Sequence, residues 1–298
     1  MNATAESSGR WFVAMQYLLP QHLLSRLVGA ITRSRVGWLR RALIAAFMRG
    51  FRPDMSDAEQ PDPQRYPSFN AFFTRALRAG ARLPSPAAHA IDSPVDGRIS
   101  ALGTSAHGRL IQAKGRDYSL RALLAGQEAL ADSLAGGLFM TIYLAPFDYH
   151  RIHMAEGGAL RAAWYVPGRL FSVNDATARH VPDLFARNER VILQFDGERG
   201  PHALVMVGAL FVGSMGTVWH GDIAPRHGRG SVALALPASA STPLARGAEL
   251  GRFNMGSTVI LLLPPGVAQW EPTLAAGSVL RVGQPIGVST GAARAGLA

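Results

Sequence analysis

Short apolar runs separated by glycine and turn residues dominate the sequence from about residue 90 onward. Runs of this length and spacing predict the strands of a mostly antiparallel β core, either a sandwich or a barrel. No internal repeat and no glycine-rich phosphate loop is present. The runs are GRISALG, LFMTIYLAP, ERVILQFDG, HALVMVGALFVGSMGTVW, GSVALALP, STVILLLPPG and GQPIGVST.

The first part of the chain has a helical pattern instead. Residues 11–51 predict two helices, in which Pro20 opens or interrupts the first and Ser34 caps the second. The second helix is expected to end near Gly50. Residues 54–68 form a polar, proline-rich connector.

Three shorter segments add helix to this prediction, at residues 69–77, 118–126 and 173–186. The sequence therefore predicts an α+β fold with a mostly antiparallel β core and amphipathic N-terminal helices. We expect a helical region over residues 1–75 and a β-rich domain over residues 76–298.

Positive charge is concentrated near the N-terminus. The chain carries a net charge of +10, and residues 1–52 hold eight arginines against Glu6 alone. Apolar and aromatic stretches at 11–25 and 36–48 lie between the arginines, whereas nucleic-acid arms are mostly polar apart from stacking aromatics. The mixture favours a membrane-surface region, with two ordinary helices packed on the core as the alternative. The uncharged run over 11–25 is too short to span a bilayer, and no secretory cleavage signal follows it.

Cysteine is absent and Lys114 is the only lysine. The lack of cysteine excludes disulfides, thiolate nucleophiles and cysteine-ligated metals. A pyridoxal phosphate Schiff base would have to use Lys114. This residue lies in QAKGRDYSL, where it is either a head-group or phosphate contact or a solvated charge.

Two segments carry acids and histidines. DSPVDGRIS offers Asp92 and Asp96, for which a hairpin turn is the alternative because Asp-Gly is a favoured turn pair. APFDYHRIHM places Asp148, His150 and His153 within six residues. Without a glutamate or a third ligand, His-x-x-His does not predict a metal site. On an extended segment the two histidines point to opposite faces, so we expect them to have different roles. The alternative is that they are a surface pair without a function.

The stretch RFNMGSTVILLL places Gly256 and Ser257 just before a predicted strand. A nucleophile elbow needs G-x-S-x-G between a strand and a helix, so that interpretation fails. The Ser257 hydroxyl can instead attack the Gly256 carbonyl, and glycine has no Cβ to block the approach. The resulting N→O acyl shift gives an ester, β-elimination releases Gly256 as a carboxylate, and hydrolysis of the dehydroalanine leaves a pyruvoyl group. Gly-Ser-Thr alone is too common to establish this chemistry.

Together and in this order, the segments resemble the proenzyme of the bacterial phosphatidylserine decarboxylase family. The resemblance extends over nearly the whole chain. Met255 departs from the leucine of many members, but it keeps the volume and polarity, so we expect unchanged processing. The blocks that carry the resemblance are SPVDGRIS, QAKGRDYSLRALLAG, APFDYHRIHM, YVPGRLFSVN, LFARNERV, VGALFVGS, GRFNMGSTVILL and GQPIGVST.

The resemblance implies an autocleavage triad of Asp96, His153 and Ser257. Chemistry agrees with this assignment, because a serine needs a base and a histidine needs a partner that fixes its tautomer and stabilises its charged form. His150 and Asp148 are then the candidates for protonating the product carbanion or holding the substrate carboxylate, with Lys114 as a further candidate for substrate contact.

The resemblance also implies cleavage between Gly256 and Ser257 into a β chain, 1–256, and an α chain, 257–298. The cofactor is then a covalent pyruvoyl group made from Ser257, with neither pyridoxal phosphate nor a metal. It forms a Schiff base with the serine amine of phosphatidylserine and acts as the electron sink while carbon dioxide leaves. The product is phosphatidylethanolamine, which assigns the chain to phospholipid biosynthesis.

An anionic lipid substrate implies a peripheral enzyme on the cytoplasmic face of the cell membrane, with phosphatidylserine in an anionic membrane as its partner and no nucleic acid. The two chains are expected to stay paired as a heterodimer, and further dimerisation is left open. Two alternatives are a serine hydrolase acting on lipid without self-cleavage and a non-enzymatic lipid-binding module.

Overall fold

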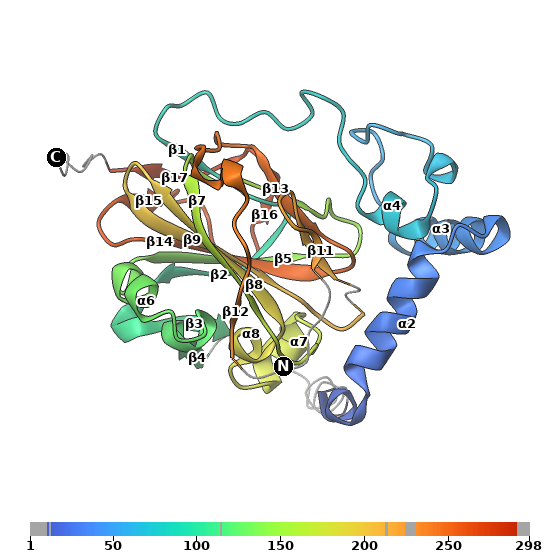
Figure 1. Ribbon diagram of the computed structural model, residues 1–298, viewed down its shortest axis with the longest axis horizontal. Coiled ribbons are helices and arrows are strands. Elements are labelled where there is room, and N and C mark those ends of the chain that lie inside the picture. The colour runs from blue at the N-terminus through green and yellow to red at the C-terminus, as the bar shows by residue number, and fades with distance from the viewer. Residues whose placement is uncertain (1–10, 12, 114, 212–213, 224–229, 291–298) are drawn as a thin grey trace.

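An eight-stranded antiparallel sheet forms the centre of the protein (Figure 1). The computed structural model describes residues 11, 13–113, 115–211, 214–223 and 230–290. In spatial order the strands of this sheet are β12 (Val232–Ala233), β7 (Ala159–Val166), β8 (Arg190–Gly197), β9 (Gly200–Val207), β14 (Ser257–Leu263), β5 (Leu138–Leu144), β2 (Gly97–Thr104) and β16 (Val279–Leu280).

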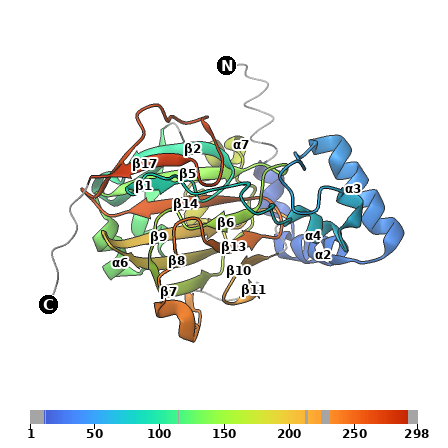
Figure 2. The same ribbon diagram turned by 90° about the horizontal axis from the view of Figure 1, so that it is seen from above.

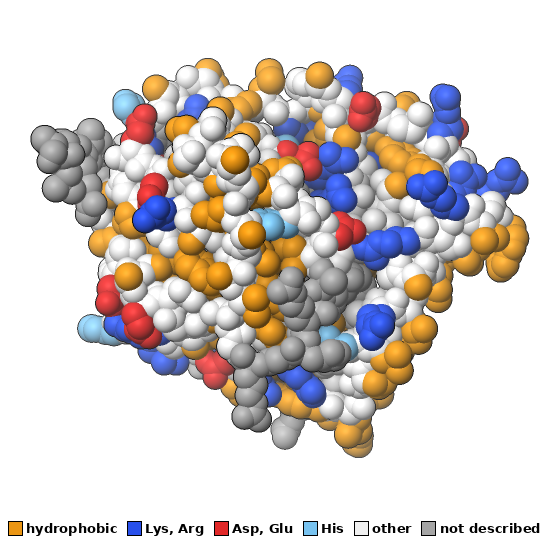
Figure 3. All heavy atoms as spheres, viewed as in Figure 1, with side chains coloured by type: hydrophobic (Ala, Val, Ile, Leu, Met, Phe, Trp, Pro, Cys, Tyr) orange, Lys and Arg blue, Asp and Glu red, His pale blue; other side chains and the backbone are white. Residues whose placement is uncertain are grey.

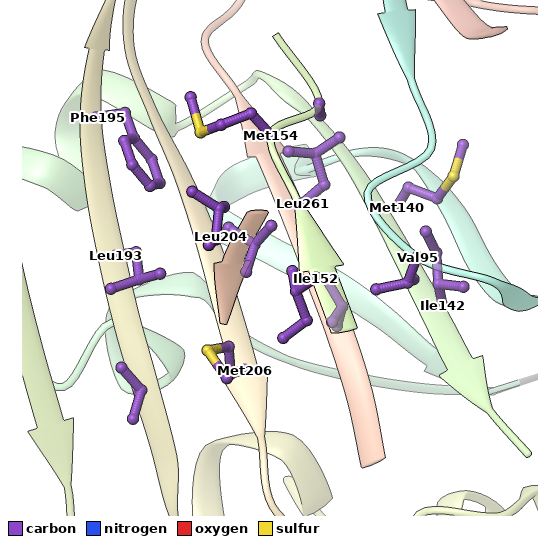
Figure 4. Close-up of a cluster of buried hydrophobic side chains, with 14 of the residues drawn as sticks. Val95, Met140, Ile142, Ile152, Met154, Leu193, Phe195, Leu204, Met206 and Leu261 are labelled. Atoms are coloured by element: carbon purple, nitrogen blue, oxygen red, sulfur yellow. The ribbon is translucent and has the colours of Figure 1, made fainter. Parts of the chain in front are cut away.

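Two smaller sheets cover one face of the large sheet. Their buried side chains share one apolar cluster with it, part of which is drawn in Figure 4. Ile152 and Met154 from the small-sheet side meet Met206 and Leu261 of the large sheet in this cluster. One small sheet is β11 (Gly221–Ile223), β10 (Met215–Thr217), β13 (Glu249–Phe253) and β6 (Arg151–His153), and the other is β1 (Ala90–Asp92), β17 (Pro285–Ser289) and β15 (Ala268–Trp270).

Short helices and a hairpin cover the opposite face. Their apolar residues form a second cluster with alternate residues of the same strands, including Ile260 and Leu262. β14 is therefore buried on both faces, which explains why its sequence STVILLL is a continuous run and does not alternate. The covering elements are α5 (Leu120–Leu123), α6 (Glu128–Leu134), α7 (Asp175–His180), α8 (Leu184–Arg187) and the hairpin β3 (Arg109–Ala113)–β4 (Arg116–Ser119).

The N-terminal helices lie together at one end of the molecule, beside the sheets (Figures 1 and 2). Residues 13–18 are helical and are followed by α2, and α4 contacts both α2 and α3. None of the helices among the described residues is both long enough and apolar enough to cross a bilayer. The elements are α2 (Gln21–Arg33), α3 (Gly37–Phe51) and α4 (Phe69–Phe73), with the short 3-10 turns η1 (Pro63–Arg65), η2 (Ala106–Gly108) and η3 (Ala238–Ser241) elsewhere.

Polar contacts dock α2 and the residues before it onto the β-rich body. The side-chain carbonyl of Gln21 accepts from Leu170 N at 2.9 Å, and that of Gln16 accepts from Ser172 N at 2.7 Å. The buried face of α2 is accordingly polar or small, consisting of Gln21, Ser25, Gly29 and Thr32.

The predicted α+β class with an antiparallel core and N-terminal helices is confirmed, and the sandwich alternative fits better than a barrel because the strand order is open at both ends. The expected cap at Ser34 is wrong. This residue ends α2, and α3 begins after Val36 without a side-chain cap. Pro20 separates α2 from the helical residues 13–18, so the first predicted helix is two.

Truncation in the middle of β14 should be costly. Leu261 is 1 % exposed, so Leu261→Ala should lower the free energy of unfolding by about 2–5 kcal/mol. Urea unfolding should be measured in a Ser257→Ala background, so that the cleavage expected at Ser257 does not divide the chain. The matched change Val279→Ala, at a side chain 62 % exposed, should cost less than about 0.5 kcal/mol. Equal effects would contradict the two-sided burial of β14.

Candidate functional site

The Gly256–Ser257 bond lies where the strands of two sheets meet. β13 ends at Phe253, whose N–H donates to the carbonyl of His150 at 3.0 Å. Four residues later β14 begins at Ser257, which pairs with Leu144 at the end of β5. The APFDYHRIHM segment therefore lies directly against the strand pair that holds the bond.

The segment that contains Asp96 lies beside the same place. The backbone N–H of His153 donates to the carbonyl of Pro94 at 2.8 Å. β1 and β2, on either side of this segment, belong to different sheets, so the alternative that DSPVDGRIS is a hairpin turn is wrong. Three sequence segments that are far apart along the chain thus come together around Ser257.

The Ser257 hydroxyl is fully buried. Its Oγ has no hydrogen-bond partner among the residues that the structure describes. A side chain at Gly256 would come no closer than 4.0 Å to its nearest neighbouring atom, the Leu144 carbonyl oxygen, so there is open space beside this glycine. The arrangement leaves an uncommitted hydroxyl next to a glycine that has open space at its Cα.

Hydrogen bonds on both ring nitrogens fix the tautomer of His153. Nδ1 lies 2.8 Å from the carbonyl of Gly247, to which it must donate. Nε2 then carries the lone pair and accepts from the Tyr149 hydroxyl at 3.0 Å. Burial lowers the pKa of His153, which favours this neutral form. His153 is thus an available base, held by a backbone carbonyl and a phenol.

Asp96 is held by a different set of contacts. Its Oδ1 accepts from Val282 N at 2.7 Å, and its Oδ2 pairs with Arg82 Nη2 at 3.0 Å. Arg82 also pairs with Asp57. No hydrogen bond joins Asp96 to His153 or Ser257 within the described part of the chain, but the Asp96 charge is close enough to raise the pKa of His153. The three residues are brought to one region without forming a hydrogen-bonded triad.

His150 lies in an apolar environment. It is fully buried, and its ring centroid is 4.1 Å from that of Phe73 in α4. Nδ1 donates to the carbonyl of Asp148 at 2.9 Å, and Nε2 has no partner among the described residues. Burial lowers the pKa of His150 to about 3, so its ring is neutral. The alternative of a plain surface pair of histidines is wrong for this residue.

The Asp148 carboxyl has a raised pKa. Its Oδ2 accepts from the backbone N–H of Ala145 at 2.7 Å, close to the end of β5. Burial is the main cause that raises its pKa to about 6, and the nearby charge of Asp96 adds to it. Asp148 therefore holds a proton at mildly acidic pH, where an ordinary aspartate would not.

Of the two other sequence candidates, only Asp92 lies in the described part of the chain. Asp92 is buried in β1, where it accepts from Ser85 N at 2.9 Å and pairs with Arg246 at 3.2 Å, so its contacts stabilise the fold. Lys114 lies outside the described residues.

Sequence reasoning missed Tyr149, Arg82 and Arg75 as members of this region. Tyr149 lies inside a segment that was singled out, but only the fold shows that its hydroxyl meets His153. Arg75 lies in FNAFFTRAL, two residues after the last of three phenylalanines. An arginine this close to an aromatic segment was the only sign in the sequence that its side chain could be buried.

Comparison with known proteins finds matches over most of the chain. A family profile described as phosphatidylserine decarboxylase matches residues 69–288, and one described as PSD matches residues 11–52. The chain is 52 % identical to the phosphatidylserine decarboxylase proenzyme of Ectopseudomonas mendocina (strain ymp), over 93 % of this chain and 98 % of that protein. It is 49 % identical to the proenzyme of the same name from Alcanivorax borkumensis, over 94 % of this chain and 96 % of that protein.

Acid should destabilise the folded protein through His150. At pH 5 an unfolded histidine, with its ordinary pKa of 6.5, binds a proton, whereas the folded ring, with its pKa of about 3, does not. Lowering the pH from 7 to 5 should therefore cost the fold about 2 kcal/mol through this residue. Asp148 has the opposite effect on stability. Because its pKa is raised in the folded state, the folded protein binds this proton at a higher pH than the unfolded chain does, so acid favours folding through Asp148.

A comparison of two unfolding curves isolates the histidine. In the Ser257→Ala background, the stability advantage of the parent over its His150→Gln variant should shrink by about 2 kcal/mol between pH 7 and pH 5. Urea unfolding at the two pH values measures it, and an unchanged difference would contradict the neutral, buried ring.

Proposed function

The chain belongs to the phosphatidylserine decarboxylase family, and we propose that it cuts its own backbone between Gly256 and Ser257 before it decarboxylates phosphatidylserine. The observation that carries this proposal is the buried, unpartnered hydroxyl of Ser257 directly after a glycine with open space at its Cα. The β chain is residues 1–256 and the α chain is residues 257–298. The pairing of β14 with β5 and β9 would keep the two chains together.

The cleavage begins when Ser257 Oγ attacks the Gly256 carbonyl carbon. A C–O bond forms, the C–N peptide bond breaks, and the hydroxyl proton ends on the released amine. β-Elimination then breaks the Cβ–Oγ bond, so that Gly256 leaves as a carboxylate and residue 257 becomes dehydroalanine. Addition of water and loss of ammonia convert it to the pyruvoyl group.

His153 is proposed as the base for the serine proton. Its tautomer already presents the Nε2 lone pair, because Nδ1 is committed to Gly247. The Tyr149 hydroxyl occupies Nε2, so His153 must exchange this partner for Ser257 as the reaction begins. Asp96 would act through its charge, which stabilises the protonated ring without touching it.

The surroundings of Ser257 suit a pyruvoyl group. All seven residues of β14 are buried, and the apolar side chains behind Ser257 keep water away. When formed, the pyruvoyl ketone supplies an acceptor for the substrate amine and for the electron pair released as carbon dioxide leaves. A dry site favours expulsion of a carboxylate, since carbon dioxide is neutral and needs less solvation.

His150 and Asp148 are proposed for the proton that replaces the carboxylate. The unpartnered Nε2 of His150 can accept and pass on a proton but does not hold one at neutral pH. The Asp148 carboxyl, with its pKa of about 6, can supply one. The pair thus combines a neutral acceptor with an acid that is partly protonated near neutral pH.

The N-terminal helices are proposed to place the enzyme on an anionic membrane, at the cytoplasmic face of the cell membrane. The outward face of α2 is apolar, with Leu23 55 %, Leu27 52 % and Ile31 46 % exposed. Trp11 and Trp38 in the same N-terminal region are also exposed, and Figure 3 shows hydrophobic side chains along the outer edge of the N-terminal helices with Lys and Arg side chains nearby. A helix that turns its polar face inward and its apolar face outward is suited to a lipid interface.

Mass spectrometry of the purified protein tests the proposed function directly. We expect two chains, with the smaller one lighter by one ammonia than simple hydrolysis would give. Borohydride reduction in the presence of phosphatidylserine should add a lipid-derived mass to the small chain only. A single unbroken chain that hydrolyses lipid would instead support the serine hydrolase alternative.

Substitutions at the site should stop maturation. Ser257→Ala should leave an uncut chain of 298 residues, because no hydroxyl remains to attack Gly256. His153→Ala should slow cleavage by about 10²–10⁴-fold, the usual contribution of a general base. Gel electrophoresis over time measures both, with His107→Ala at an exposed position as the control. Normal cleavage in His153→Ala would remove this residue from the mechanism.

Membrane binding should depend on the outward face of α2. Changing Leu23, Leu27 and Ile31 together to serine should weaken binding to phosphatidylserine-containing vesicles by about 10- to 100-fold, since three apolar side chains no longer leave water. Vesicle co-sedimentation measures this, and Val279→Ser, at an exposed position on β16, is the control. Added salt should weaken binding of the parent protein through its arginines. Unchanged binding of the triple variant would contradict the proposed membrane face.

A further inference from the structure

Arg75 is a buried cation without a counter-ion. It follows α4 and is only 4 % exposed. One nitrogen, Nη2, donates to the carbonyl of Phe147 at 3.2 Å. Nε and Nη1 have no hydrogen-bond partner in the described part of the chain, and no carboxylate there forms an ion pair with this guanidinium. Because a buried, unpaired charge is strongly unfavourable, a compensating anion is to be expected.

Arg75 belongs to the same region as the candidate site. Phe147 immediately precedes Asp148, and Phe73, two residues before Arg75, packs on His150. The charge of Arg75 lowers the pKa of both Asp148 and His150. The guanidinium is therefore near the groups proposed for proton transfer.

The acids of the site do not neutralise it by direct contact. Asp96 is committed to Arg82 and to the backbone N–H of Val282, and Asp148 accepts from the backbone N–H of Ala145. The donors of Arg75 that are free among the described residues are thus available to a group that is not part of the protein.

The place of α4 in the fold indicates which group this is. α4 contacts α2 and α3, which carry the apolar outer surface, and it packs on the other side against His150. In a serine phospholipid the phosphodiester lies between the acyl-bearing glycerol and the reacting serine. Arg75 has the corresponding position, between the proposed membrane face and the proposed reaction site.

We propose that Arg75 binds the phosphodiester of the substrate head group. This inference rests on the proposed function. The reacting carboxylate is the less suitable ligand, because pairing it with a cation would stabilise the ground state and oppose loss of carbon dioxide. A guanidinium is well matched to phosphate oxygens.

Cleavage at Gly256 provides a route to this buried cation. Met255 packs against the aromatic cluster that includes Phe72 and Phe73. The side-chain amide nitrogen of Asn70, in α4, donates a hydrogen bond to the side-chain oxygen of Asn254 at 3.1 Å. Asn254 is also bonded to Ser214, so the free chain end after the cut is Met255 and Gly256. Movement of these two residues away from α4 would make the phosphate site accessible with maturation.

Two soluble probes separate the phosphate from the rest of the substrate. Glycerophosphoserine and serine methyl ether both carry the amine and the carboxylate, but only the first has a phosphodiester. The mature wild-type protein should decarboxylate glycerophosphoserine with the higher kcat/KM. In Arg75→Gln this preference should fall by about 10- to 100-fold, the usual effect of losing a charged hydrogen bond, while the rate with serine methyl ether stays within about twofold.

Matched variants keep the test decisive. Arg121→Gln, at an exposed arginine of α5, should keep the full preference. Arg75→Lys keeps the charge but not the planar donors, so it should mature normally and lose part of the preference, and it replaces Arg75→Gln if that variant fails to fold. Cleavage into two chains is measured on every preparation.

Three results would overturn the assignment. Equal losses with both probes would mean that Arg75 serves the fold or the new Gly256 carboxylate, and an unchanged preference would mean that it does not bind phosphate. Inhibition of the serine methyl ether reaction by inorganic phosphate at lower concentrations than by glycerophosphoserine would indicate a free-phosphate site. If the wild type itself neither cleaves nor reacts with either probe, the proposed function fails instead.

Discussion

The pairing of β14 with both of its neighbours is the constraint on which the rest of the structure depends. From Ser257 to Leu263 this strand is in register with β5, from Thr258 to Leu262 with β9, and each residue is buried. The strand therefore holds the residue at its first position firmly, whatever happens to the peptide bond before it. The cut and the loss of the Ser257 nitrogen change only this first position, and the pairing and apolar contacts of the strand from Thr258 onward remain.

Burial also sets the protonation states around that position. The same desolvation that keeps His150 and His153 neutral keeps a proton on Asp148 to a higher pH than usual. Histidines that are neutral can accept protons, and an acid that stays protonated can give one away. The proton transfers proposed for this site therefore depend on burial, which gives common histidine and aspartate side chains the protonation states that the reaction needs.

Much of the fold was predictable from local sequence patterns. The features that were not predictable have identifiable physical reasons. β14 was visible because a strand buried on both faces reads as an unbroken apolar run, whereas β7, with ALRAAWYV, was missed because its polar Arg161 and small alanines break the pattern. Asp96, His153 and Ser257 were assigned to one site only through a resemblance. The contacts of Asp96 with Arg82 and of His153 with Gly247 and Tyr149 depend on the fold, and one of these partners is a backbone carbonyl that no sequence motif encodes.

The polar docking of the N-terminal helices has a consequence for how the protein behaves in lipid. An apolar contact between α2 and the body would lose its driving force once both sides could be solvated by acyl chains. The amide contacts of Gln16 and Gln21 respond in the opposite way, since hydrogen bonds strengthen as competing water is withdrawn. If the N-terminal helices bind a bilayer as proposed, the hydrogen bonds that join the N-terminal segment to the β-rich body would therefore strengthen there, and the two parts would be held together more rigidly on the membrane.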